Sequence, residues 1–317
     1  MTLRRRELFV LPALLAAKPG LTARERVDRA AAGQDVDRPP LSLWHHFGLE
    51  KFGAARHAEA TLRFHRDYST DLVKVMSDFP YPKPAGTWYE LTPQASPFPE
   101  QLKALDIIRR DLNGKAHFIE TIFNPWNVAE KLSSKEEVLR LMRAQPGKLL
   151  EALGAIARSE ANHARLAIAG GASGIFLAIA NAQDGILTRG EYRKFSEPFD
   201  RIVLDAVDSA PLNVLHLHGD KVWLDSFLSG WTARVVNYSA HGTGVSILSL
   251  RAKYRGVLMG GVDERNYRQA GVDSLRQQVH DARTAAGAKL IVTPGCSVPN
   301  ESTPAELKKL AAAIRDS

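Results

Sequence analysis

Short apolar segments alternate with longer amphipathic segments along nearly the whole chain, and this alternation constrains the fold more than any other feature. The longer segments carry apolar residues at helical spacing, as in 148–168 and 191–207. Such alternation predicts an α/β protein with a parallel sheet built from βα units. Eight strands are expected, at residues 41–46, 72–76, 117–122, 174–177, 213–218, 235–238, 257–260 and 290–293.

Eight strands with helices between them predict a (β/α)8 TIM barrel that forms a single domain over residues 22–317. The length of 317 residues and the hydrophobic content of 44% suit one large barrel. A doubly wound sheet would need a glycine-rich phosphate-binding turn after an early strand. The chain has none, because the glycines at 170–171 and 242–244 are typical of ordinary loops.

The charge distribution argues against a nucleic-acid partner. The formal net charge is +7, but basic residues are scattered among acidic neighbours and form no run interleaved with aromatic residues. We therefore expect a small-molecule substrate. The single cysteine, Cys296, excludes an intramolecular disulfide and leaves a free thiol, a metal ligand or a small buried side chain.

The first 21 residues differ from the rest and predict an export signal or an N-terminal extension. Arg4, Arg5 and Arg6 precede an apolar stretch at 8–17, which resembles a twin-arginine signal and is too short to span a bilayer. Export to the periplasm is the expectation, and an amphipathic leading helix on a cytoplasmic protein is the alternative. No later segment is long and apolar enough to cross a membrane, so no membrane association is expected after processing.

Polar residues gather where the predicted strands end, which is the face that carries active sites in TIM barrels. From these positions we select candidate catalytic residues, substrate-binding residues and metal ligands. The candidate catalytic residues are His241 and Asp78. The candidate substrate-binding residues are His45, His46, Asn181, Asp184, Tyr238 and Asp263, and the candidate metal ligands are His216, His218 and Cys296.

The metal ligands are chosen for their chemistry and spacing. His216 and His218 lie two residues apart at the end of a predicted strand, so both side chains point to the same face. Cys296 follows the last predicted strand, between Gly295 and Ser297 in a loop bounded by prolines. Two imidazoles and a thiolate are ligands that a catalytic Zn²⁺ takes while one position stays open. A structural role for one histidine is the alternative.

Several of the other candidates have competing structural interpretations. His241 could be a general base, a fourth ligand or a solvated loop residue. His45 and His46 are adjacent on a strand, so at most one points at the site. Asp78 could form a turn, and helix capping competes with substrate contact at the remaining acids and amides. These are Asn181, Asp184, Asp220 and Asp263; His57, His65, His163 and His280 lie in helical segments and are expected at the surface.

Sequence stretches in a characteristic order resemble one enzyme superfamily over residues 22–317. They are 22–27 leading to 37–40, 123–129, 171–176, 185–188, Tyr192, 195–198, 260–263 and 295–299. In this order and spacing they are similar to the uroporphyrinogen decarboxylase superfamily. The resemblance implies a (β/α)8 barrel, in agreement with the strand count.

Two branches of that superfamily imply different chemistry. True decarboxylases use no metal and bind tetrapyrrole carboxylates through an arginine-rich first loop, with an aspartate after the second strand. Asp78 matches that aspartate, but the first loop at 44–49 has no arginine. Zinc-dependent methyltransferases carry His-x-Cys at the fifth strand and a second cysteine after the eighth. His216 and Cys296 match this pattern, and His218 stands where the family has cysteine.

The leading hypothesis is therefore a zinc-dependent methyltransferase-like enzyme with a His-His-Cys site. The resemblance implies a corrinoid, either as a substrate or bound to a partner protein. It leaves open whether the protein forms a homo-oligomer. Because an imidazole replaces a thiolate at His218, hydrolytic or lyase chemistry also stays open. The alternatives are a metal-free porphyrinogen decarboxylase and a non-catalytic ligand-binding barrel.

Overall fold

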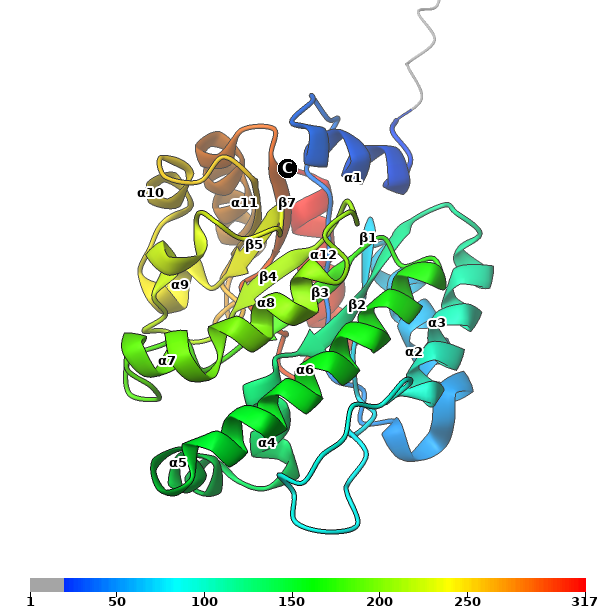
Figure 1. Cartoon of the computed structure of the whole chain (residues 1–317). Helices are drawn as coiled ribbons and strands as arrows, with labels where there is room; N and C mark the ends of the chain where they lie inside the picture. The colour runs from blue at the N-terminus through cyan, green and yellow to red at the C-terminus, as the bar shows by residue number, and fades with distance from the viewer. Residues whose placement is uncertain (1–19) are drawn as a thin grey trace, which may run out of the picture.

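A single curved sheet of parallel strands forms the centre of the protein (Figure 1). The computed structural model describes residues 20–317. Within this range the sheet has seven strands, and each strand pairs with the next one along the chain. The strands are β1 (Leu72–Val75), β2 (His117–Phe123), β3 (Ile175–Ile179), β4 (Val214–Leu217), β5 (Val235–Tyr238), β6 (Val257–Val262) and β7 (Leu290–Pro294).

Helices connect the strands and cover the outside of the sheet (Figure 1). The α-helices are α1 (Ala23–Ala32), α2 (Gly53–Tyr68), α3 (Pro99–Leu112), α4 (Pro125–Leu132), α5 (Lys135–Ala144), α6 (Pro146–Ala169), α7 (Arg189–Phe195), α8 (Glu197–Asp205), α9 (Ala240–Thr243), α10 (Ile247–Arg251), α11 (Val272–Ala286) and α12 (Pro304–Arg315). Two 3₁₀ turns, η1 (Glu50–Phe52) and η2 (Leu224–Phe227), complete the set. The predicted α/β class with a parallel βα sheet is confirmed.

The prediction of eight strands is wrong in one place, because the segment at 41–46 is not a strand. Only Leu41 pairs with the sheet, through an isolated parallel bridge to Val292 of β7. Its carbonyl oxygen also accepts from the backbone N–H of Leu72 in β1 at 3.3 Å, so one residue links the two edge strands. Pro40 has no N–H to donate to a ladder, and the N–H of Leu41 donates to the side chain of Asp71 at 2.8 Å. The N–H of Leu41 is therefore not available to pair with β1.

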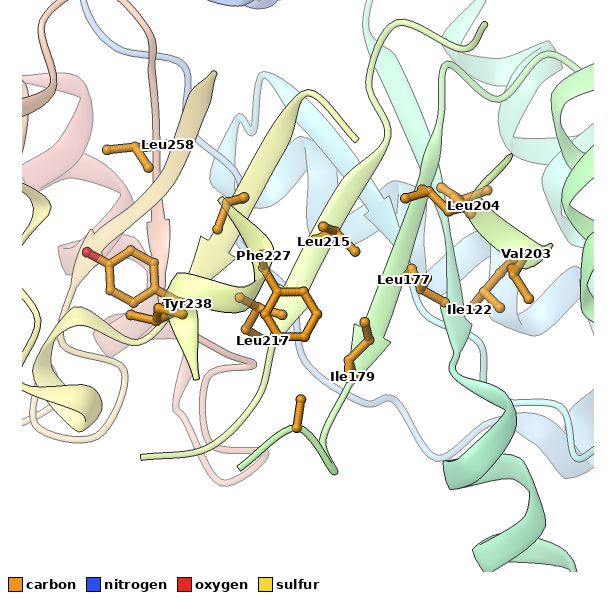
Figure 2. Packing of buried hydrophobic residues seen from close by; sticks show 14 of the residues in the cluster. Ile122, Leu177, Ile179, Val203, Leu204, Leu215, Leu217, Phe227, Tyr238 and Leu258 are labelled. Carbon is orange, nitrogen blue, oxygen red and sulfur yellow. The ribbon is translucent and has the colours of Figure 1, made fainter. Parts of the chain in front are cut away.

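The two faces of the sheet carry different side chains. On the outer face, aliphatic residues of β3, β4 and β5 pack against α8 and η2, as Figure 2 shows for Leu177, Leu215 and Phe227. The inner face holds a second apolar cluster that includes Trp44, Phe176 and Met259. Alternation along the parallel strands brings the inner-face residues into rows. One such row runs through Ala178, His216, Asn237 and Met259.

Two long predicted helices have different outcomes. The helix expected at 148–168 is α6, which begins two residues earlier and ends one residue later. The helix expected at 191–207 is interrupted at Ser196, so that α7 and α8 are separate. Pro198 lies in the first turn of α8, where its missing N–H costs nothing, whereas inside a continuous helix it would remove a hydrogen bond.

The predicted export segment at 1–21 lies almost entirely outside the described residues, which begin at Gly20. None of the helices in residues 20–317 combines the length and the apolar character that a membrane span requires.

Candidate metal centre

The three candidate metal ligands converge at the carboxyl end of the sheet. His216 lies in β4, His218 follows directly after it, and Cys296 lies in the loop after β7. The Cys296 sulfur is 3.3 Å from Nδ1 of His218 and 3.7 Å from Nε2 of His216. The ligand atoms of the three residues all lie within 4.8 Å of one another. Zinc bonds of about 2.0–2.3 Å in a tetrahedron place ligand atoms roughly 3.4–3.7 Å apart, so this group fits the ion.

The orientation of His216 is fixed by its neighbours on the inner face. Nδ2 of Asn237 donates to the carbonyl of Met259 at 2.8 Å, which leaves the Asn237 Oδ1 as an acceptor. Nδ1 of His216 donates to this oxygen at 2.5 Å. Its Nε2 faces Cys296 and is the nitrogen left to bind a metal ion. Phe176 stacks on the imidazole, with 4.9 Å between ring centroids. A hydrogen bond of this kind to the far nitrogen is typical of metal-binding histidines.

The loop that carries Cys296 is held against β5 and β6. The N–H of Gly295 donates to Oε2 of Glu264 at 3.1 Å. A Cβ atom on Gly295 would lie 2.3 Å from the Cα of Ser239, so only glycine allows this approach. Gly219 adopts a φ of +123°, and a Cβ there would collide with Gln183. Both glycines are therefore required next to the ligands.

The electrostatic environment favours a thiolate at Cys296. Burial alone would raise the pKa of the thiol, but hydrogen bonds from His216 and His218 lower it to about 4. The hydrogen bond to Cys296 in turn raises the pKa of His218, against the effect of burial. A thiolate is the form that binds a metal ion. Two imidazoles and a thiolate, with a cavity on their open side, match a zinc site that leaves a position for substrate.

A cavity of about 420 Å³ opens directly in front of the three ligands. Its wall is largely apolar, with Trp44, Met76, Phe123 and Phe176 from the inner face. Its polar residues outside the ligand group are His46, Lys74, Thr121, Asn127, Glu130, Lys131, Lys135 and Ser297. Such a mixture of apolar wall and few polar groups is typical of a small-molecule site.

The two adjacent histidines of the first loop point in different directions, as their strand-like spacing indicated. His46 lines the cavity, and its Nδ1 lies 3.0 Å from Oδ1 of Asp78. His45 packs instead against Phe47 and Phe64, and burial lowers its pKa. Asp78 lines an adjoining cavity of about 220 Å³, and its contact with His46 links it to the main cavity.

Five other candidates do not line the cavity in front of the metal ligands and have other surroundings. Oδ1 of Asp184 accepts from the indole of Trp223 at 2.8 Å, and the buried Tyr238 donates to the carbonyl of Val245. Asp263 accepts from backbone N–H groups in its own turn, with His241 3.9 Å away. His241 lines a separate pocket of about 570 Å³ between α9, α10 and α11. The fifth is Asn181, which belongs to a buried network.

A closed polar network accounts for Asn181. Its amide donates to Oγ of Ser196 at 2.9 Å, and its Oδ1 accepts from Asn124. The same Asn124 amide donates to Oδ1 of Asp200, while Tyr192 donates to Oδ2 of Asp200 at 2.9 Å. All five side chains are buried. Burial raises the pKa of Asp200 to about 7, although the hydrogen bonds from Tyr192, Asn124 and Ser196 act in the opposite direction.

The helix histidines were predicted at the surface, and this is wrong for two of them. His57 and His163 are fully buried, and Nε2 of His163 lies 2.9 Å from Oε1 of the buried Glu120. His65 is partly buried, while His280 is exposed. Helical periodicity places His57 and His163 on the faces of α2 and α6 that pack inward. Asp220 caps no α-helix in residues 20–317 and instead forms an ion pair with Arg265.

Lys74 is a cavity residue that the sequence reasoning missed. It lies at the centre of β1, points to the inner face and is 6% exposed. Burial lowers the pKa of its amine to about 7, although the charges of Cys296, Asp78 and Glu120 raise it. A signal was available in the sequence, because a lysine alternates with Leu72 and Met76 in a strand that is otherwise apolar.

Fold and site together define a class of α/β protein with a curved parallel sheet and a candidate metal centre where the strands end. The model of the uroporphyrinogen decarboxylase (URO-D) family matches residues 81–317. The chain therefore belongs to this family, which confirms the resemblance seen in the sequence. The uroporphyrinogen decarboxylase of Synechococcus sp. (strain JA-3-3Ab) is 27% identical over 265 residues, which cover 68% of this chain and 72% of that protein.

Further relatives extend this picture. The uroporphyrinogen decarboxylase of Shewanella sp. (strain ANA-3) is 28% identical over 254 residues, 64% of this chain and 71% of that protein. A methyltransferase from Methanosarcina mazei superimposes with a TM-score of 0.73 at 18% identity and covers 93% of this chain and 99% of its own. A B12-independent methionine synthase from Shewanella sp. W3-18-1 superimposes with a TM-score of 0.61 at 11% identity. It covers 88% of this chain and 93% of its own. At these identities the two structures establish a shared fold.

Proposed function

We propose that this chain is a zinc-dependent enzyme of the uroporphyrinogen decarboxylase family that transfers a methyl group to a thiol. The observation that carries the proposal is the convergence of His216, His218 and Cys296 on one point in the wall of a cavity of about 420 Å³. His216 would hold zinc through the nitrogen that faces Cys296, because its other nitrogen is engaged by Asn237. Bound zinc would lower the pKa of a thiol substrate, so that it reacts as a thiolate.

The protein's own residues would prepare the remaining parts of the reaction. Trp44, Met76 and Phe176 form an apolar wall that excludes water from the open side of the ligand group. His46 faces the same cavity and is paired with Asp78, so it is placed to accept the proton that a thiol releases. The sulfur–methyl bond would form as the donor–methyl bond breaks, with the electron pair staying on the donor. The methyl donor would be a small molecule or a methylated corrinoid.

Metal analysis tests the ligand set directly. We expect purified wild-type protein to bind one zinc ion per chain and the Cys296→Ser variant to lose it. Ser297→Ala is the matched control, because this side chain lines the same cavity and lies 3.8 Å from the Cys296 sulfur. A wild type without zinc, or a Cys296→Ser variant with full occupancy, would contradict the proposal. Incubation with methylcobalamin and a thiol then measures zinc-dependent loss of the cobalt–methyl chromophore.

A second candidate function is decarboxylation of a porphyrinogen without metal, and the family membership favours it. Asp78 follows β1 and is the residue that resembles the aspartate of that branch. Lys74, Lys131 and Lys135 provide cations in the cavity, although the first loop has no arginine. Incubation of metal-free protein with uroporphyrinogen, followed by product analysis, distinguishes the two functions. Carbon dioxide release that persists in a chelator would favour this alternative.

A further inference from the structure

An ammonium group without an acidic partner lies inside the cavity of the candidate metal centre. Among residues 20–317, Lys74 forms no ion pair, and its Nζ has one polar contact, the Met76 sulfur at 2.8 Å. The amine lies 4.4 Å from the ring centroid of Phe176 and 5.3 Å from that of Trp44. A buried charge is expensive unless it is paired. A thioether and two aromatic faces compensate only part of this cost.

The surroundings of the cavity reinforce this charge imbalance. Glu130 is the one carboxylate among the described residues that line it, and both of its oxygens are engaged. Oε1 accepts from the indole of Trp126 at 2.9 Å, and Oε2 accepts from Asn127 at 3.1 Å. Lys131 and Lys135 line the same cavity. The wall therefore carries three lysines and one carboxylate, and among residues 20–317 none of these lysines forms an ion pair.

We propose that Lys74 binds a carboxylate of the substrate, so that the thiol acceptor of this enzyme is a thiol acid. This inference rests on the proposed function, because it concerns the molecule whose sulfur reaches the ligand group. Lys74 and the ligands line one cavity, and Phe176 contacts both the Lys74 amine and the His216 ring. A short thiol acid can place its sulfur at the ligand group and its carboxylate at the amine. The carboxylate then gives the buried Lys74 amine the ion-pair partner that it lacks among residues 20–317, and it favours the protonated form of that amine.

A pair of probes that differ only in charge tests the inference. 3-Mercaptopropionate carries a carboxylate, and 3-mercaptopropionamide has the same size and the same thiol but no charge. With zinc-loaded protein in a calorimeter, we expect wild type to bind the acid at least about tenfold more tightly than the amide. Lys74→Met removes the charge while keeping an unbranched side chain. We expect this variant to bind both probes equally, with an unchanged affinity for the amide.

Two further variants control for folding and for general electrostatics. Lys74→Arg keeps a cation at the site and should retain most of the preference for the acid. Lys135→Met removes the same charge from an exposed residue of the cavity wall, where solvent screens it. The preference of this variant for the acid over the amide should differ from that of wild type by less than about twofold. An unchanged preference in Lys74→Met, or an equal loss in Lys135→Met, would overturn the inference. Circular dichroism establishes that each variant is folded.

Cobalt substitution separates this inference from the proposed function. Cys296 itself contributes a thiolate–cobalt charge-transfer band, so an increase of this band on addition of a probe reports that the probe's sulfur reaches the metal. No increase with either probe would contradict the thiol-acceptor function, while the calorimetric preference for the acid still reports on Lys74. An increase with both probes and no preference in wild type would contradict the role of Lys74 alone.

Discussion

Two groups of polar side chains lie at the carboxyl ends of the strands, and they differ in whether their hydrogen bonds are complete. The network around Asn124, Asn181 and Asp200 is closed, because its members donate and accept among themselves. The cavity group is open: among residues 20–317 Lys74 forms no ion pair, and His216, His218 and Cys296 line a cavity. Position at the end of a strand therefore does not by itself define the site. Incomplete pairing around a cavity is the better indicator.

The largest expected effect is on metal affinity in the open group. We expect His218→Ala to weaken zinc binding by more than about a hundredfold, because loss of a ligand exceeds the 10–100-fold effect of its outer neighbours. The stability of the metal-free protein should change little. Competition with a fluorescent zinc chelator measures the affinity. His280→Ala is the control, because this histidine is exposed on α11. If both variants bound zinc with the same affinity, His218 would not be a ligand, and the contrast between the cavity group and the buried network would not hold.

The closed network should show the opposite pattern. Asn124→Ala removes hydrogen bonds to Asn181 and Asp200 together with the N-cap of α4. We expect the free energy of unfolding to fall by about 3 kcal/mol, because buried partners lose their hydrogen bonds. Zinc affinity should stay within about twofold of wild type. Denaturant titration measures the stability, with the exposed Asn266→Ala as the control. An Asn124→Ala variant that is as stable as wild type but binds zinc more weakly would show that Asn124 serves the metal centre and not the stability of the fold.

A smaller effect concerns pH. The pKa of Asp200 is about 7 in the folded protein, against an ordinary value of 3.8, because its carboxyl is buried. Between these two values the folded state binds more protons than the unfolded state, so stability falls as pH rises. We expect Asp200→Asn to show a flatter dependence across this window than wild type. Thermal unfolding of both proteins at a series of pH values tests this, and identical slopes would contradict it.

The smallest effect is expected for a charged pair beside the metal centre. Asp220 and Arg265 are both exposed and form an ion pair on the rim. We expect Asp220→Asn to change the free energy of unfolding by less than about 1 kcal/mol, and the change should vanish at high salt. Denaturation at low and high ionic strength measures it. A large loss of stability that does not depend on salt would show that this exposed pair stabilises the protein as the buried network does.

The sequence predicted the fold class well because each strand is a short apolar segment, and periodicity is a local property. It placed His216 and His218 on one face from spacing alone, and β4 has this alternation. It failed at 41–46, where only Leu41 bridges to the sheet and its N–H donates to Asp71, which lies 30 residues away. Such a contact is set by tertiary structure and has no local signal.

The errors in the candidate site have a similar physical origin. Asn181, Asp184 and Tyr238 follow strands, but whether a polar group at a strand end faces a cavity or a neighbour depends on long-range packing. His57 and His163 occupy the buried faces of their helices, which polarity alone would place outside. Lys74 was overlooked because lysine is rarely buried, and that rarity is what makes it informative.

The ligand group draws on the middle of the chain and on its last part, and this has a consequence for the order of assembly. His216 and Cys296 are 80 residues apart. The loop that carries Cys296 is tied to the first loop by a hydrogen bond from the N–H of His46 to Asn300 across 254 residues. During synthesis, β4 leaves the ribosome before the loop that carries the third ligand. Metal uptake would therefore report that this loop has reached His216 and His218, and a chain cut before Cys296 would lack the complete centre.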